Sequence, residues 1–354
     1  MLQEKLKERT LPPLPVVSSE EEWEDVRKNL LRQFCREEYG VPLPEAQSVT
    51  VQVITEDTNC LAGKAHFYKL RLTTRVQGQD FSFPVEAVVP YRPEPVPAFV
   101  CISFFEHVPN FSLPAEDVVD AGFAAFSFHY TDITTDDGDF STGLAGLLGK
   151  GDRSEEAPGK LMMWAWAAQR VMDALQNFPG VDPARVAVVG HSRLGKAALV
   201  AGALDTRFTL VIANESGCSG AALSRGKIGE DIRAITKTFP FWFCPAYGAY
   251  AGREEELPFD QHALLALCAP RYAYVCSAQE DLWADPTSEF LSCVAASPAW
   301  EALGKPGFSA PDRLPEVGDA FGDGSIGYHL RAGAHGLLRE DWLHFLAFFR
   351  QHLA

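Results

Sequence analysis

Short apolar runs separated by helical segments dominate the chain from residue 97 onward. The runs lie at 97–104, 123–130, 186–190, 210–215, 271–278 and 326–333. Between them, as at 161–178, apolar residues recur every three or four positions, which is typical of amphipathic helices. Buried strands that alternate with helices are typical of a parallel sheet covered on both faces. The pattern therefore predicts an α/β protein, a three-layer α/β/α sandwich around a mostly parallel central sheet.

The first ninety residues follow other patterns. Residues 1–45 mix charged residues with prolines, and a helix is expected at about 21–38. Apolar and polar residues alternate from 66 to 91, which predicts an antiparallel hairpin. Further helices are expected directly after Ser192 and over 338–353, with a long Gly/Pro loop at 304–325. We therefore expect an N-terminal extension (1–45) packed on a single catalytic domain (46–354).

Composition narrows the classes of partner and compartment. The formal net charge of -16 repels phosphate backbones, so no nucleic-acid partner is expected. No apolar run is long enough to span a membrane, and the N-terminal residues contain no apolar signal core. The eight cysteines are scattered singly, which favours a reducing compartment. The sequence thus predicts a cytoplasmic protein that does not bind membranes.

The strongest local signal for chemistry is VAVVGHSRLGKAALVAGAL at 186–204. A buried strand runs into a turn that carries Ser192, and a helix of small residues follows. This order is typical of the nucleophile elbow of the α/β-hydrolase fold, although Leu194 stands where G-x-S-x-G has its second glycine and Gly195 comes one position later. The helix N-terminus behind the serine supplies N–H groups for an oxyanion. The plainer interpretation is a serine that caps a helix.

A serine nucleophile needs a general base, and His335 fits best among nine histidines. It lies in a glycine-flanked loop between the last predicted strand and the last helix, and this fold orders its triad as serine, acid, histidine. His107 is a weaker candidate. His191 neighbours the serine, but we expect its side chain to diverge from the site at the elbow.

Two residues are candidates for the acid that orients the histidine. Asp281 follows the predicted strand at 271–278, where the fold usually places its acid, and Glu215 ends the preceding strand. Either could reach His335 from a neighbouring strand end, and the local pattern does not rank them.

The stretch from 190 to 217 resembles the glucuronoyl esterases, particularly the bacterial members. These enzymes carry an elbow of the type G-C/H-S-R-x-G-K-G/A-A, followed about twenty-three residues later by E-S-G, and the resemblance continues through TDDGDF (135–140), EDLWADP (280–286) and GAHG (333–336). It covers roughly 90 to 354. His191 stands where fungal members carry a cysteine, so their disulfide is not expected here.

The resemblance implies roles for individual residues. Ser192 would attack the carbonyl of a glucuronate ester, and Arg193 would hold the oxyanion. Lys196 would bind sugar hydroxyls, and Glu215 matches the family's acid while Asp281 matches its alternative. The remaining matches are a sugar-binding glutamate, Glu230, and a tryptophan at the uronate site, Trp283.

The resemblance predicts a serine carboxylic-ester hydrolase that acts on a carbohydrate ester. Esters of glucuronic or 4-O-methyl-glucuronic acid are the expected substrates, by way of an acyl-enzyme. Related sequences are often labelled acetylxylan esterases, so a sugar acetyl esterase is the alternative; an inactive hydrolase fold that only binds is a third hypothesis. No cofactor and no metal are expected, because no ligand spacing typical of zinc is present. Four aspartates lie close together, but their spacing is not that of an EF-hand, and they are expected to be solvated or to brace a loop: Asp132, Asp136, Asp137 and Asp139.

Overall fold

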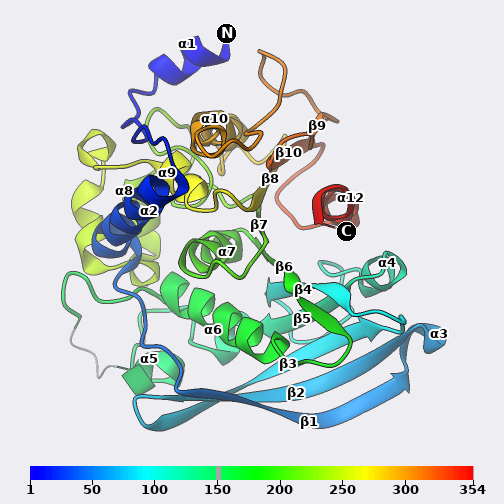
Figure 1. The fold of residues 1–354 in the computed structure, drawn as a ribbon. Helices are drawn as coiled ribbons and strands as arrows, with labels where there is room; N and C mark the ends of the chain where they lie inside the picture. Colours follow the sequence, from blue (N-terminus) through cyan, green and yellow to red (C-terminus); the bar gives the residue numbers. More distant parts are fainter. Residues whose placement is uncertain (149–152, 354) are drawn as a thin grey trace.

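A ten-stranded sheet runs through the centre of the computed structural model, which describes residues 1–148 and 153–353 (Figure 1). The strand order is β1-β2-β3-β5-β4-β6-β7-β8-β10-β9. The strands are β1 (Ser48–Asn59), β2 (Ala65–Val76), β3 (Gln79–Pro90), β4 (Val96–Ser103), β5 (Ala124–His129), β6 (Val181–His191), β7 (Leu210–Asn214), β8 (Tyr272–Ala278), β9 (Ala320–Phe321) and β10 (Ile326–Arg331).

Strands β5, β4, β6, β7, β8 and β10 pair in parallel, and they coincide with the six apolar runs. The antiparallel pairing of β2 with β3 confirms the predicted hairpin. Strand β1 was not predicted. It pairs with β2 at the edge of the sheet and is almost wholly exposed, so no buried face marks it in the sequence. The glycine- and proline-rich segment at 304–325 is a loop that also contributes β9, which pairs with β10.

Helices cover both faces of this sheet, which confirms the predicted sandwich (Figure 1). On β4, Val100 and Ile102 face the core shared with α6 and α7, whereas Phe99 and Cys101 face the core under α4 and α12. The helices are α1 (Leu2–Lys7), α2 (Glu20–Phe34), α3 (Cys60–Gly63), α4 (Ala115–Asp120), α5 (Gly143–Leu148), α6 (Lys160–Leu175), α7 (Arg193–Leu204), α8 (Ile232–Thr238), α9 (Gln261–Ala266), α10 (Pro286–Ala296), α11 (Pro298–Glu301) and α12 (Arg339–Leu353). Single turns lie at Cys35–Tyr39, Tyr130–Asp132, Pro240–Trp242, Pro245–Tyr250 and Glu254–Glu256.

The N-terminal residues lie against the body that the sheet forms. The Trp23 indole N–H donates to the carbonyl of Ala269 at 3.1 Å, and the Tyr39 hydroxyl donates to that of Ser219 at 3.0 Å. Trp23 and Tyr39 are both almost fully buried, so α2 and the turn after it cover apolar surface. The division of the chain at residue 45 stays a prediction.

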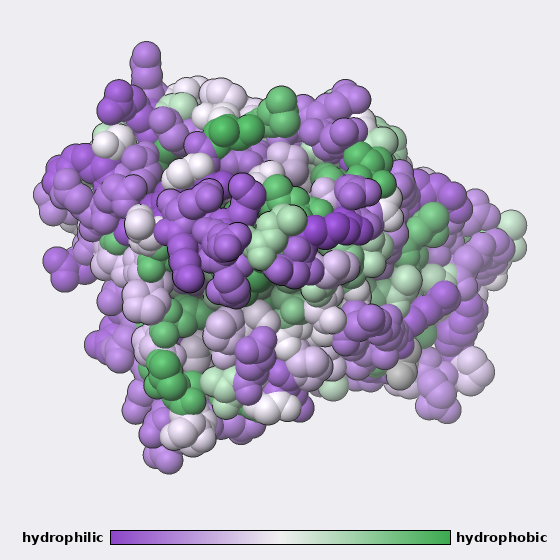
Figure 2. Space-filling model, turned by 90° about the horizontal axis from the view of Figure 1, so that it is seen from above, coloured by the Kyte–Doolittle hydropathy of each residue, from purple (hydrophilic) through white to green (hydrophobic). Residues whose placement is uncertain are grey.

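Hydrophilic residues predominate on the face drawn in Figure 2, where the hydrophobic ones form small, separate patches. This agrees with the acidic composition, which carries a formal net charge of -16. Within residues 1–148 and 153–353, no helix is both long and apolar enough to cross a bilayer.

Candidate active site

Ser192 lies in a strained turn between β6 and α7. Its φ of 57° and ψ of -128° fall in a region that L-residues rarely adopt, and its N–H donates to the carbonyl of Asn214 at 2.9 Å. A Cβ on Gly190 would come 2.0 Å from the carbonyl oxygen of Leu194, and one on Gly195 would come 3.1 Å from Ser216 Cβ. Glycine is therefore needed at 190 and favoured at 195, which explains why the second glycine stands one position later than in G-x-S-x-G.

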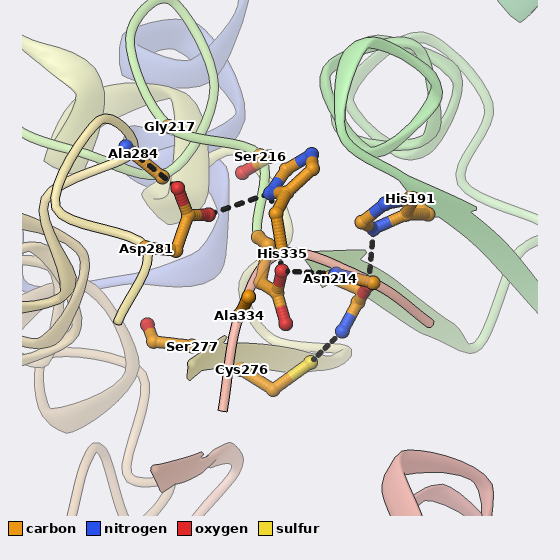
Figure 3. A network of polar contacts seen from close by, with 12 residues as sticks. His191, Asn214, Ser216, Gly217, Cys276, Ser277, Asp281, Ala284, Ala334 and His335 are labelled. Carbon is orange, nitrogen blue, oxygen red and sulfur yellow. Dashed lines mark hydrogen bonds and ion pairs between the residues drawn. The ribbon is translucent and has the colours of Figure 1, made fainter. Parts of the chain in front are cut away.

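His335 lies between the two predicted acids. It belongs to the loop that joins β10 to α12, and its Nδ1 is 2.6 Å from Asp281 Oδ2, a contact drawn in Figure 3. The same Nδ1 is 3.1 Å from Glu215 Oε2. Asp281 follows β8, and Glu215 follows β7. Because parallel strands end at the same edge of the sheet, both carboxylates converge on one imidazole nitrogen. The sequence left these two acids as alternatives, and the structure brings both to His335.

The charges of this cluster are coupled. Burial lowers the pKa of His335, but its hydrogen bonds to Asp281 and Glu215 outweigh that effect and raise the pKa to about 9. Burial raises the pKa of Asp281, yet the hydrogen bond from His335 leaves it below its ordinary value. Burial keeps the pKa of Glu215 above its ordinary value. Asp281 is therefore the carboxylate that most readily stays charged beside the imidazolium.

A residue that the sequence analysis did not single out, Arg331, fixes Glu215 and the His335 loop. Arg331 is 1% exposed, and its Nη2 donates to Glu215 Oε1 at 2.5 Å and to the carbonyls of Ala334 and Gly336. Its Nε donates to Asp341 Oδ1 at 3.2 Å. The one available signal was an arginine in an otherwise apolar strand. The Arg331 guanidinium therefore links the loop that carries His335, called the base loop below, to Glu215, which His335 also contacts.

A cavity of about 340 Å³ opens beside Ser192, and all eight predicted site residues line it. They are Ser192, Arg193, Lys196, Glu215, Glu230, Asp281, Trp283 and His335. Lys196 is 4% exposed and its Nζ donates to the carbonyl of Ser216 at 2.5 Å, whereas Trp283 is 59% exposed. The lining residues that were not predicted include two aromatic ones, Phe239 and Trp242. The cavity wall therefore combines charged and aromatic side chains.

Arg193 is held by the acidic loop at 135–140. Its Nη1 forms an ion pair with Asp136 Oδ2, and the Trp242 indole N–H donates to Asp136 Oδ1 at 2.7 Å. The guanidinium carbon lies 4.6 Å from the centre of the Trp242 ring. In the described part of the chain, its Nη2 has no hydrogen-bond partner. Asp137 and Asp139 bond within their own loop, in agreement with the expected bracing role. For Asp136 the expectation is wrong, because its carboxylate is largely enclosed and binds Arg193 and Trp242 instead.

The other two histidines discussed from the sequence lie differently. His107 has a side chain that is 70% exposed and bonds through Nδ1 to Glu86, away from the residues that line the cavity. The prediction that the His191 side chain diverges from the site is wrong. The centre of its ring lies 4.4 Å from that of His335, because β6 ends with this ring turned toward the base loop (Figure 3).

Two groups of potential metal ligands come together in the described residues. One is His191, Glu215 and His335; the other is Cys276, His329 and Asp341. In each, members already bond to one another, as His335 does to Glu215 and as His329 Nε2 does to Asp341 at 2.8 Å. Hydrogen bonding accounts for both groups, and the absence of a functional metal stays a prediction.

A larger cavity, of about 540 Å³, lies between α6 and the segment at 42–49. Its charged residues pair with one another, as Arg170 and Arg207 both do with Asp173. It brings no histidine to a serine. We therefore assign the chemistry to the smaller cavity at Ser192.

The sequence model of the family described as "Glucuronyl esterase, fungi" matches residues 72–304. Carbohydrate esterase MZ0003, from an unknown prokaryotic organism, is 41% identical over 241 residues, which cover 67% of this chain and 55% of that protein. A 4-O-methyl-glucuronoyl methylesterase of Podospora anserina is 32% identical over 301 residues, which cover 81% of this chain and 58% of that protein. The chain thus spans a little over half the length of these two curated relatives.

Solved structures match over nearly the whole chain. A glucuronoyl esterase from Solibacter usitatus superposes with a TM-score of 0.89 at 32% identity, over 98% of each chain. A structure described as a promiscuous CE15 esterase from a marine bacterial metagenome superposes with a TM-score of 0.85 at 30% identity, over 98% of this chain and 99% of that one.

Proposed function

Because the chain belongs to the glucuronyl esterase family, we propose that it hydrolyses esters of glucuronic or 4-O-methyl-glucuronic acid. The observation that carries this proposal is the cavity of about 340 Å³, which Ser192 and His335 line together with Lys196 and Glu230. A uronate ester places its reacting carbonyl one bond from the sugar ring. Groups that bind sugar hydroxyls must then lie directly beside the nucleophile, as Lys196 does one helical turn after Ser192.

The reaction proceeds in two halves. Ser192 Oγ attacks the ester carbonyl while Nε2 of His335 takes its proton, and the alcohol then leaves with that proton. Water repeats the sequence on the acyl-enzyme and releases the uronic acid. Asp281 and Glu215 bind Nδ1 of His335 and stabilise the imidazolium that forms in each half.

Arg193 provides the positive charge for the oxyanion. Asp136 binds one of its terminal nitrogens and Trp242 covers the guanidinium plane, so Nη2 is available to donate to the developing charge. A guanidinium keeps its proton throughout the reaction, which suits this role better than an amine would.

Lys196 and Glu230 supply a donor and an acceptor for ring hydroxyls, and the exposed Trp283 offers an indole face and N–H at the cavity mouth. The polar wall thus supports a uronate as the acyl group. In a sugar acetyl ester the acyl group is acetyl, whose carbonyl carries only a methyl group, and the sugar is the alcohol that leaves.

Methyl glucuronate and an acetylated xylo-oligosaccharide, offered side by side, test the proposal. We expect kcat/KM for methyl glucuronate to exceed that for the acetyl ester by about 100-fold or more, because hydroxyl-binding groups discriminate strongly when left unpaired. Lys196→Ala should lower kcat/KM for the uronate ester and spare a small aryl acetate, which has no sugar hydroxyls. A preference for the acetylated sugar would replace the proposal with the acetyl esterase.

The pH dependence of kcat/KM should identify His335 as the base. The base must be neutral to accept a proton, so activity should rise with pH as His335 loses its proton, with a midpoint near its pKa of about 9. In His335→Ala, kcat/KM should no longer rise with pH in this range (the acid limb of the profile), and only a small residual rate should remain. His107→Ala should keep the limb, because that side chain is 70% exposed and bonds to Glu86. An inactive His107 variant beside an active His335 variant would mean that the base is misassigned.

A further inference from the structure

His191 and His335 form a pair of contacting imidazoles inside the site. Their ring centres are 4.4 Å apart and their planes meet at 41°, and Figure 3 shows the two rings side by side above the ends of the strands. On its other side, His191 meets Phe104 edge to face at 6.1 Å. One ring is thus enclosed between an aromatic side chain and the base.

The His191 ring is anchored from below. Its Nδ1 shares a hydrogen bond of 2.5 Å with Oδ1 of Asn214, and Nδ2 of Asn214 donates to Cys276 Sγ at 3.0 Å (Figure 3). Asn214 is fully buried, and its carbonyl also accepts the N–H of Ser192 at 2.9 Å. One buried residue therefore fixes both the nucleophile's main chain and the ring that precedes it.

His335, in contrast, lies on an exposed loop. Its side chain is 42% exposed, with Gly333 and Gly336 nearby in the loop. Asp281 and Glu215 hold its Nδ1, which lies along one edge of the ring. The His191 ring packed against the face of His335 adds a second restraint on the orientation of the base.

We infer that His191 is a positioning residue for the reaction, a half-buried ring that orients His335 and stabilises its protonated form. This inference rests on the proposed function, since it assigns His335 as the base. Proton transfer from Ser192 turns His335 into a cation, and the face of a neutral aromatic ring attracts a cation.

The surroundings of His191 keep it uncharged. Burial, with the positive charge of His335 as the second cause, lowers the pKa of His191 to about 4. The charged groups that face it are His335, Asp281, Asp341 and Glu215, and none of the three carboxylates hydrogen-bonds to it. A second imidazolium at 4.4 Å would oppose protonation of the base, whereas a neutral ring favours it.

Three substitutions distinguish the contribution of the His191 ring face from that of its hydrogen bond to Asn214. His191→Phe keeps an aromatic face and loses the bond to Asn214; His191→Gln keeps a polar group for Asn214 and loses the face; His191→Leu keeps only volume. We expect the Phe variant to stay near wild-type kcat. The Gln and Leu variants should lose about 2-fold to 30-fold in kcat with KM little changed. Their acid limb in kcat/KM should move to lower pH, because the imidazolium of His335 loses a stabilising partner.

His66→Leu is the matched control, since the His66 ring stacks on Tyr68 at 3.9 Å on β2, whereas the His191 ring contacts His335. It should leave activity unchanged. Thermal unfolding checks that each variant folds. If the Leu variant does not fold, the Gln variant still tests the inference. Gln and Leu variants with wild-type kcat and an unmoved limb would overturn the inference, as would a folded Phe variant no more active than Leu.

The rate at which a fluorophosphonate labels Ser192 separates this inference from the proposed function, because labelling needs the serine and its base but no sugar ester. If the Phe variant is labelled like wild type and the Leu variant slowly, while no variant cleaves methyl glucuronate, the role of His191 stands and the proposed substrate falls. Equal labelling rates in all variants would overturn the inference whatever the substrate.

Discussion

Replacing Ser192 with alanine should lower the esterase kcat by about 10⁴-fold or more, because nucleophile and base act as a unit. The strained backbone of this residue, with φ at 57°, presents its side chain at the edge of the sheet beside a cavity of about 340 Å³. The measurement is the steady-state rate with methyl glucuronate, together with labelling by a fluorophosphonate probe. The variant should be folded and unlabelled.

Ser82→Ala is the control for this experiment. Ser82 lies exposed on β3, where its hydroxyl bonds to that of Thr73 at 2.8 Å, and its loss should change neither rate nor labelling. A Ser192 variant that keeps a tenth of the wild-type activity would remove the assignment of the nucleophile. A wild-type protein that the probe does not label would instead favour an inactive, binding fold.

Burial determined which parts of the fold could be predicted from the sequence. The six parallel strands are enclosed between two layers of helices, so each appears as an uninterrupted apolar run. Strand β1 is held at the sheet edge by its hydrogen bonds to β2 and has no buried face, so hydrophobic patterning could not reveal it.

The site likewise has parts that could be predicted from the sequence and parts that could not. The elbow could be predicted because its strain and close approaches demand particular residues in sequence, Gly190 before Ser192 and a small residue after it. The partners of His335 depend on where separate strands end in space. Spacing therefore identified Glu215 and Asp281 as candidates but could not show that both reach Nδ1. Arg331 and His191 make their contacts with elements far apart in the chain, so local spacing could not show which residues they meet.

Removing both carboxylates from His335 should cost far more than the two single losses multiplied together. In Glu215→Gln and Asp281→Asn, one carboxylate still lies within 3.1 Å of Nδ1, so each single variant should lose only about 10-fold in kcat/KM. The double variant leaves the imidazolium uncompensated and should lose about 10⁴-fold. Each single change should also move the acid limb below the wild-type midpoint, because the two hydrogen bonds raise the pKa of His335 to about 9. Glu289→Gln is the control: this buried carboxyl bonds to Gly217 and Ser277 instead of His335.

Comparison of the wild type, the two single variants and the double variant also shows whether only one of the two carboxylates is the triad acid. A single variant as inactive as the double variant would end the idea of sharing and make that residue alone the triad acid. The spacing from Ser192 favours Glu215 for this outcome. The geometry favours Asp281, which lies 2.6 Å from Nδ1 and has a pKa below its ordinary value. Glu215 lies 3.1 Å from Nδ1, and its other carboxylate oxygen accepts a hydrogen bond from Arg331. We therefore expect Asp281→Asn to have the larger effect of the two single variants, on both kcat/KM and the position of the acid limb.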